Sequence, residues 1–397
     1  MQKNISYILN RNENLFLNDL EENQIVLNQI IKSSSFLIIG GAGSIGSSVV
    51  NEIFKRNPKI LHVVDNSENN LTELVRYLRS SVGYIDGEFE TFAIDSYSDE
   101  FDTLIENKPS YDFVFNLAAL KHVRSESDPY TLMRMTLINV HNTYNSLKLT
   151  KLKGSKKYFS VSSDKSTNPV NLMGASKSIM EKILIQESKN HYITSARFAN
   201  VAFSDGSLLH GFDKRLINLQ PITAPIGIKR YFITQKESGE LCLLSGLIGE
   251  NREIFFPKLD PNKHMQSFDN IAIKYLEDKG YTPYLCQSEE EARKKSKDLI
   301  SNKKWPCYFF QSKTTGEKEF EEFYDHQEIV NLKKFNSIGV IKLNLENLNK
   351  NYENFMKEID QLRISKKWTK KDILNIYQEY LPNFKHLEKK ITLNQIM

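Results

Sequence analysis

The sequence predicts an α/β protein: a Rossmann-type doubly wound parallel sheet with a smaller C-terminal lobe. Three observations support this fold class. The stretch "SSFLIIGGAGSIGSSVVNEIFKR" reads as a strand, a glycine turn and a helix. Strand and helix patterns then alternate up to about residue 200, as in a parallel sheet with crossover helices. Beyond that point loops, short strands and a helix follow, which indicates a second lobe.

The first strand, "FLIIG", leads into a helix through a glycine turn. In this turn Gly40, Gly43 and Gly46 have the spacing G-x-x-G-x-x-G. Glycine lets the chain turn tightly and lets backbone N–H groups approach a pyrophosphate at the positive end of the helix. We therefore expect a dinucleotide here, with a glycine-rich turn that binds nothing as the alternative.

The second and third strands, "LHVVD" and "TFAID", each end in an acid, Asp65 and Asp95. Asp65 is placed to accept hydrogen bonds from the adenosine ribose, and no arginine follows that would bind a 2′-phosphate, so NAD is favoured over NADP. Asp95 is placed near the adenine amino group, and a helix-capping role is the alternative for either acid. The predicted NAD-binding residues are Gly40, Gly43, Ser44, Ile45, Gly46, Asp65, Asn66, Asp95, Ala118, Ala119 and Lys177.

The fourth and fifth strands, in "DFVFNLAALKHV" and "KYFSVSSDKS", lead to the most specific motif, "SSDKSTNPVNLMGASK". With "GGAGSIGSSVV", "VVDNSENNL" and "RYFIT", this order resembles the polysaccharide-biosynthesis nucleotide-sugar 4,6-dehydratases, which are extended short-chain dehydrogenase/reductases acting on UDP-N-acetylglucosamine. The resemblance covers roughly residues 33–345. Met173 stands where many such enzymes have a tyrosine, four residues before Lys177, and "DNSENNL" is similar to the NAD-using branch that carries methionine.

The resemblance implies oxidation at sugar C4, removal of the C5 proton, loss of the C6 hydroxyl and return of the hydride to C6. Such a site needs an acid and a base side by side. We expect Asp164 to protonate O6, with its carboxyl kept neutral by burial, and Lys165 to take the C5 proton as an amine with a depressed pKa. Ser163 would hydrogen-bond the C4 oxygen. A polar strand-end turn is the alternative for the triplet.

Lys177 is expected to bind the nicotinamide ribose, with a solvated lysine as the alternative. Met173 either packs against the nicotinamide or sugar, or fills the core. A thioether cannot take a proton. The C4 hydroxyl proton must leave by another route, through Ser163, Asp164 or a water towards Lys177, and the sequence leaves that choice open.

On the substrate side, the resemblance implies roles for four residues. Lys121 in "NLAALKHV" would lie near the substrate or nicotinamide, and Asn200 in "RFANVAF" would contact the diphosphate or sugar. Arg230 would bind the diphosphate, with a surface arginine as the alternative, and Glu317 in "TTGEKEF" would hold the uridine ribose. Thr314 and Thr315 replace the usual Arg-Pro, which leaves the nucleotide open. Asn139 is similar to an asparagine that steadies the active-site backbone.

These assignments divide the chain into four parts. We expect an N-terminal helical extension at 1–32, the NAD-binding Rossmann domain at 33–200 with later segments returning to it, a substrate-binding lobe at 201–345 with an insertion near 285–312, and a helical C-terminal tail at 346–397. The resemblance also implies a homo-oligomer.

Composition excludes several other classes. The net charge of +4 over 397 residues includes no dense basic block, so nucleic acid is not an expected partner. Three cysteines without C-x-x-C spacing argue against a metal site and suit a reducing compartment. Neither a signal peptide nor a membrane span is expected, which favours a cytoplasmic protein.

The favoured function is NAD-dependent dehydration of a UDP-N-acetylhexosamine, with UDP-N-acetylglucosamine as the expected substrate, in surface-glycan synthesis. A nucleotide-sugar 4-epimerase on the same scaffold is one alternative, because it needs C4 oxidation but no acid–base pair at C5 and C6. A non-catalytic NAD-binding regulator is an alternative of another class.

Overall fold

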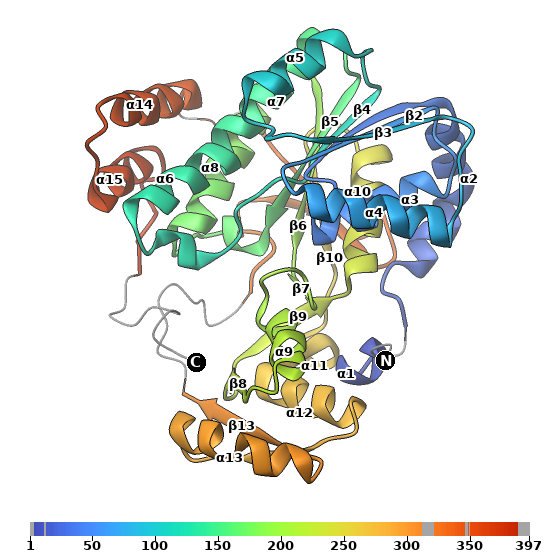
Figure 1. Cartoon of the computed structure of the whole chain (residues 1–397). Coiled ribbons are helices and arrows are strands. Elements are labelled where there is room, and N and C mark those ends of the chain that lie inside the picture. The colour runs from blue at the N-terminus through green and yellow to red at the C-terminus, as the bar shows by residue number, and fades with distance from the viewer. Residues whose placement is uncertain (1–3, 12, 312–320, 346–347, 349, 388–397) are drawn as a thin grey trace.

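The computed structural model describes residues 4–11, 13–311, 321–345, 348 and 350–387 (Figure 1). A nine-stranded sheet forms its centre, in the order β14-β15-β10-β6-β5-β4-β1-β2-β3. Seven of these strands run parallel to one another, β15 runs antiparallel to its neighbour β10, and β14 runs antiparallel to β15. Their bounds are β1 Ser35–Ile39, β2 Ile60–Asp65, β3 Glu88–Ala93, β4 Phe113–Asn116, β5 Lys157–Ser163, β6 Tyr192–Phe198, β10 Glu253–Pro257, β14 Ile329–Asn331 and β15 Ile338–Lys342.

Helices cover both faces of this sheet (Figure 1). One face packs against α2 (Leu17–Ser33), α3 (Ser44–Phe54), α4 (Glu68–Ser81) and α10 (Gln235–Leu247). The other face packs against α5 (Asp99–Asn107), α7 (Asn142–Leu152) and α8 (Leu172–Glu187), with α6 (Pro129–Thr136) beside α8. Every residue of β1 is buried, as expected for a strand covered on both faces. The predicted fold class is confirmed.

A smaller lobe lies below the carboxyl ends of the parallel strands (Figure 1). It contains two three-stranded sheets: β11-β9-β7, and β12-β13-β8, whose strands all run parallel. The segment predicted as an insertion near 285–312 holds α13 and β13, and β13 joins β12 to β8. The elements of the lobe are β7 Asn200–Val201, α9 Leu208–Ile217, β8 Ile222–Pro225, β9 Lys229–Ile233, α11 Pro261–His264, β11 Met265–Ser267, α12 Phe268–Asp278, β12 Thr282–Leu285, α13 Glu289–Ser301 and β13 Lys304–Phe310.

The described helices near both ends of the chain pack on this same chain. Near the N-terminus, α1 (Ile5–Ile8) joins the apolar core of the smaller lobe, and α2 lies on the Rossmann sheet. Between them, Arg11 forms a bidentate ion pair with Glu237 of α10, with N–O distances of 2.8 and 2.6 Å. At the other end, α14 (Tyr352–Ile364) and α15 (Lys370–Tyr380) pack against α6 and α8 in a common apolar cluster.

Candidate active site

The glycine turn between β1 and α3 has the geometry of an anion site. Gly40 has a φ of +74°, and Gly43 is the N-cap of α3 with no side-chain capping bond. The N–H groups of the first turn of a helix have no partner within the helix, and the helix dipole favours an anion there. The Ser44 hydroxyl at this helix end donates to the carboxylate of Asp205, 2.8 Å away. The turn therefore fits the pyrophosphate of a dinucleotide.

Replacing Gly46 by alanine is expected to unfold the turn, whereas replacing Gly43 is not. A Cβ on Gly46 would lie 2.1 Å from the Gly40 carbonyl oxygen, so the backbone must shift, at a cost of about 1–3 kcal/mol in unfolding free energy. The nearest atom to a Cβ on Gly43 is 3.5 Å away. Denaturant unfolding should show a loss for Gly46→Ala only. Calorimetry with NAD should show weaker binding for Gly43→Ala, because its Cβ obstructs the approach of the phosphates.

The two predicted acids close turns at the carboxyl ends of their strands. The Asp65 carboxylate accepts the N–H groups of Ala42 and Ser67, both at 3.0 Å, and so ties the glycine turn to β2. Asp95 accepts the N–H of Tyr97 at 2.9 Å. A carboxylate oxygen has more than one lone pair, so the bonds at Asp65 leave acceptor capacity for a ribose hydroxyl.

Ala118 lies against the glycine turn, next to Ala119 and beyond the end of β4. A Cβ on Gly40 would lie 2.6 Å from the Ala118 nitrogen, so only glycine allows this approach. The chain reverses its strand order between β1 and β4, where doubly wound sheets bind their ligands. The predicted NAD residues Gly40, Gly43, Ala118 and Ala119 therefore meet at the switch point of the sheet.

The predicted acid–base residues lie together where β5 ends and the short helix η3 (Asp164–Ser166) begins. The Ser163 hydroxyl donates to Asp164 Oδ1 at 2.8 Å, and Lys165 Nζ is 3.2 Å from the same oxygen. The Asp164 side chain is 3% exposed and that of Lys165 is 32% exposed. A buried carboxyl and a partly accessible amine are thus in direct contact.

The charge state of Lys165 differs from the prediction. Burial alone would lower the pKa of Lys165, but the charges of Asp164 and Glu321 outweigh burial and raise that pKa above its ordinary value. The predicted depressed pKa of Lys165 is therefore wrong in this arrangement. C5 deprotonation needs a neutral amine at Lys165, which this arrangement disfavours.

A buried ion-pair network, which the sequence did not reveal, bonds the two serines that flank the Ser163–Lys165 turn. Glu181 of α8 accepts the hydroxyls of Ser162 and Ser166, at 2.5 and 2.8 Å. Arg197 of β6 donates to Glu181 at 2.8 and 3.0 Å and to Glu328 at 2.8 Å. Burial would raise the pKa of Glu181, but the Arg197 guanidinium and the two hydroxyls lower it below its usual value.

The M-x-x-x-K pair is buried on α8. Lys177 Nζ donates to the Val161 carbonyl at 2.9 Å, and burial lowers the pKa of Lys177 to about 8. Met173 is 3% exposed in the apolar cluster shared by α6, α8, α14 and α15, and its N–H donates to Glu126 at 2.9 Å. These surroundings are those of a core residue, which is one of the two roles left open for Met173.

Three of the four predicted substrate residues, Lys121, Asn200 and Arg230, lie in the described part of the chain. Lys121 Nζ donates to the Ser204 hydroxyl at 3.0 Å, and burial lowers the pKa of Lys121. Asn200 of β7 donates to the carbonyl of Tyr231, next to Arg230 on β9, at 3.1 Å. Glu317 lies outside the described residues.

Asn139 holds the backbone beyond β4. It lies in a π-helical turn, η2 (Leu137–His141), a form that often marks functional sites. Its side chain exchanges hydrogen bonds with the backbone of Leu120, at 2.9 and 3.0 Å, and donates to Ser176 at 2.9 Å. This geometry suits the predicted steadying role.

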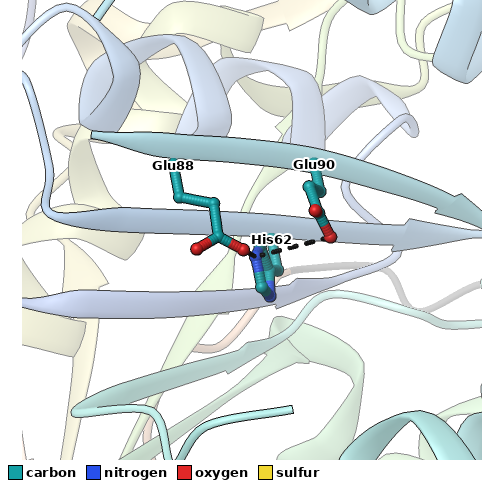
Figure 2. A group of neighbouring side chains, drawn as sticks. All are labelled: His62, Glu88 and Glu90. Carbon is teal, nitrogen blue, oxygen red and sulfur yellow. Dashed lines mark hydrogen bonds and ion pairs between the residues drawn. The ribbon is translucent and has the colours of Figure 1, made fainter. Parts of the chain in front are cut away.

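A separate polar cluster occupies β2 and the edge strand β3 (Figure 2). His62 Nε2 is 2.7 Å from Glu88 and 3.8 Å from Glu90, which makes these three the one group with metal-ligand spacing among the described residues. The Lys108 ammonium contacts both carboxylates, and the Tyr111 hydroxyl lies 2.7 Å from His62 Nδ1. The Lys108 ammonium already supplies the positive charge that a metal ion would bring to these two carboxylates, so we assign this cluster a structural role.

Comparison with known proteins identifies the class. The family described as polysaccharide biosynthesis protein matches residues 36–343. An uncharacterized membrane protein of Methanocaldococcus jannaschii, MJ1061, is 30% identical over 79% of this chain and 87% of its own. The inverting UDP-N-acetylglucosamine 4,6-dehydratase of Campylobacter jejuni is 29% identical over 59% of this chain and 70% of its own. The X-ray structure of Pen from Bacillus thuringiensis has a TM-score of 0.64 at 23% identity, covering 84% of this chain and 98% of that one.

Fold and site thus define a Rossmann-type enzyme of the nucleotide-sugar dehydratase and epimerase superfamily. Within it, the chain belongs to the polysaccharide biosynthesis protein family, whose match covers most of its length. Nucleotide-sugar 4-epimerases are also among the matching proteins. No helix in the described part of the chain is both long and apolar enough to cross a membrane.

Proposed function

We propose that the protein is an NAD-dependent 4,6-dehydratase of a UDP-N-acetylhexosamine, with UDP-N-acetylglucosamine as substrate, in surface-glycan synthesis. The observation that carries this proposal is the contact between Asp164 and Lys165 at the end of β5. An epimerase has no use for an acid and a base at C5 and C6, whereas a dehydratase needs both. The cytoplasmic location and the homo-oligomer remain predictions.

The residues that would hold NAD are those of the glycine turn, together with Asp65, Ala118, Ala119 and Lys177. When bound, NAD would accept the hydride from sugar C4 and later supply it to C6. The fit rests on the uncapped start of α3 and on the close approach that Gly40 and Gly46 allow.

The chain's own residues would handle the protons. Asp164 and Lys165 first exchange one proton along their 3.2 Å contact, which leaves a neutral carboxyl and a neutral amine. Lys165 Nζ then takes the C5 proton while Asp164 protonates O6, so that the C6–O bond breaks and water leaves. Lys165 later returns its proton to C5. The pair then regains one proton from solvent, which balances the C4 hydroxyl proton released to solvent when C4 is oxidised. The Ser163 hydroxyl, which Asp164 orients, would hydrogen-bond the C4 oxygen.

The first test is mass spectrometry of UDP-N-acetylglucosamine incubated with the purified protein without added cofactor. A dehydratase is expected to lower the sugar nucleotide mass by one water, with a 4-keto-6-deoxy sugar visible by NMR. An unchanged mass with a new configuration at C4 would instead establish the epimerase. NAD binding without any change in the sugar would support the regulator.

A further inference from the structure

Glu321 bonds two strands of the smaller lobe and interacts electrostatically with the catalytic turn, and neither the sequence nor the family comparison assigned it a role. Its side chain is 3% exposed. One carboxylate oxygen accepts the Tyr231 N–H at 2.7 Å, and the other accepts the Asn200 side-chain amide and lies 4.0 Å from Arg230 Nε. A single buried carboxyl thus contacts β7 and β9, the two strands that carry predicted substrate residues.

The same carboxyl interacts electrostatically with the acid–base pair. Burial first, and then the charge of Asp164, raise the pKa of Glu321 to about 7, while the cations Lys165 and Arg230 oppose this shift. Conversely, the charge of Glu321 raises the pKa of Lys165. The charged or titratable groups that face Glu321 in the described part of the chain are Asp164 and Lys165 from η3, and Arg230 and Tyr231 from β9.

The proton exchange between Asp164 and Lys165 depends on this neighbour. An ionised Glu321 stabilises the Lys165 ammonium and so opposes formation of the neutral amine. A neutral Glu321 lacks the charge that stabilises the Lys165 ammonium, and it can still accept hydrogen bonds from the Asn200 amide and the Tyr231 N–H. The neutral carboxyl therefore combines two functions: it keeps the two strands in place and it favours the proton exchange.

We propose that Glu321 is a positioning residue whose carboxyl holds Asn200 and Arg230 beside the Asp164–Lys165 pair. This proposal rests on the dehydration proposed above. It predicts that dehydration slows as the pH rises through about 7, because Glu321 ionises there. It also predicts that UDP, whose diphosphate would contact Asn200 and Arg230, binds less tightly when the carboxyl is removed.

The test compares Glu321→Gln, Glu321→Ala and the control Glu322→Gln, an exposed neighbour that accepts from Asn168 at 3.4 Å. Two quantities are measured across pH 6–9: the rate of water loss and the affinity for UDP by calorimetry. Glutamine stays neutral, and its one oxygen still accepts the Tyr231 N–H at the expense of the bond from the Asn200 amide, so Glu321→Gln should lose the decline above pH 7. Glu321→Ala should bind UDP about tenfold or more weakly, the effect of about one lost charged hydrogen bond. Glu322→Gln should match the wild type in both.

Several outcomes would overturn the proposal. One is a wild-type pH profile retained by Glu321→Gln; another is an unchanged UDP affinity in Glu321→Ala. If the wild type binds UDP but removes no water, the dehydratase assignment fails on its own, and the UDP affinities of the variants still decide the positioning role. If the wild type does not bind UDP, the positioning role is wrong. Thermal unfolding of each variant separates a lost contact from a lost fold.

Discussion

Replacing Lys165 by methionine or Asp164 by asparagine is expected to lower the rate of water loss by about 10²- to 10⁴-fold, the usual contribution of a general acid or base. Methionine keeps the length of the Lys165 side chain but cannot carry a proton. Asparagine keeps the shape of Asp164 but cannot protonate O6. Either change removes the proton exchange along the 3.2 Å contact.

Oxidation at C4 should survive both changes, since it precedes the steps at C5 and C6. Each variant should therefore give a partial rise in reduced-nicotinamide absorbance when the sugar nucleotide is added, without loss of water. Lys156→Met, at an exposed lysine paired with Asp112, is the matched control and should dehydrate at the wild-type rate. Full turnover by either Asp164→Asn or Lys165→Met would show that the pair does not carry the proton steps.

Replacing Arg197 by leucine should destabilise the fold by about 3–5 kcal/mol, the usual effect of removing one partner from a buried ion pair. Arg197 is 4% exposed and Glu181 is 6% exposed, so leucine would leave the Glu181 carboxylate without its cation in a nearly dry environment. Glu328 and the Phe323 carbonyl would lose a donor as well. Denaturant unfolding of Arg197→Leu beside the wild type measures the loss of unfolding free energy.

The control for Arg197 is Arg76→Leu. Arg76 pairs with Glu73 on the surface of α4, where both side chains are 70% exposed, and such a pair contributes at most about 1 kcal/mol. A loss in Arg197→Leu no larger than that in Arg76→Leu would contradict a stabilising role for the buried network. A lower dehydration rate in folded Arg197→Leu is also expected, because Glu181 holds Ser162 and Ser166 on either side of the acid–base pair.

The alternation of strands and helices in the parallel core could be predicted because its signals are local. Strands β1, β2 and β4 are short, largely apolar runs that end in glycine or polar residues, β3 and β5 mix apolar with polar residues, and each neighbouring helix has its own apolar spacing. The later strands β10, β14 and β15 return to the sheet across long stretches of chain, so only their general return was expected. The bounds of the smaller lobe were likewise approximate, since its strands are short.

The sequence by itself determined the fold class, the glycine turn and the Ser163-Asp164-Lys165 triplet, because residues adjacent in the chain make these features. The tertiary structure decided what these groups can do. Glu321 reaches Asn200 across 121 residues, and Glu328 reaches Arg197 across 131. Burial and charges from such distant residues set the pKa of Lys165 and Glu321, and packing by α14 and α15 encloses Met173. A protonation state depends on neighbours in space, and no local pattern of residues records them.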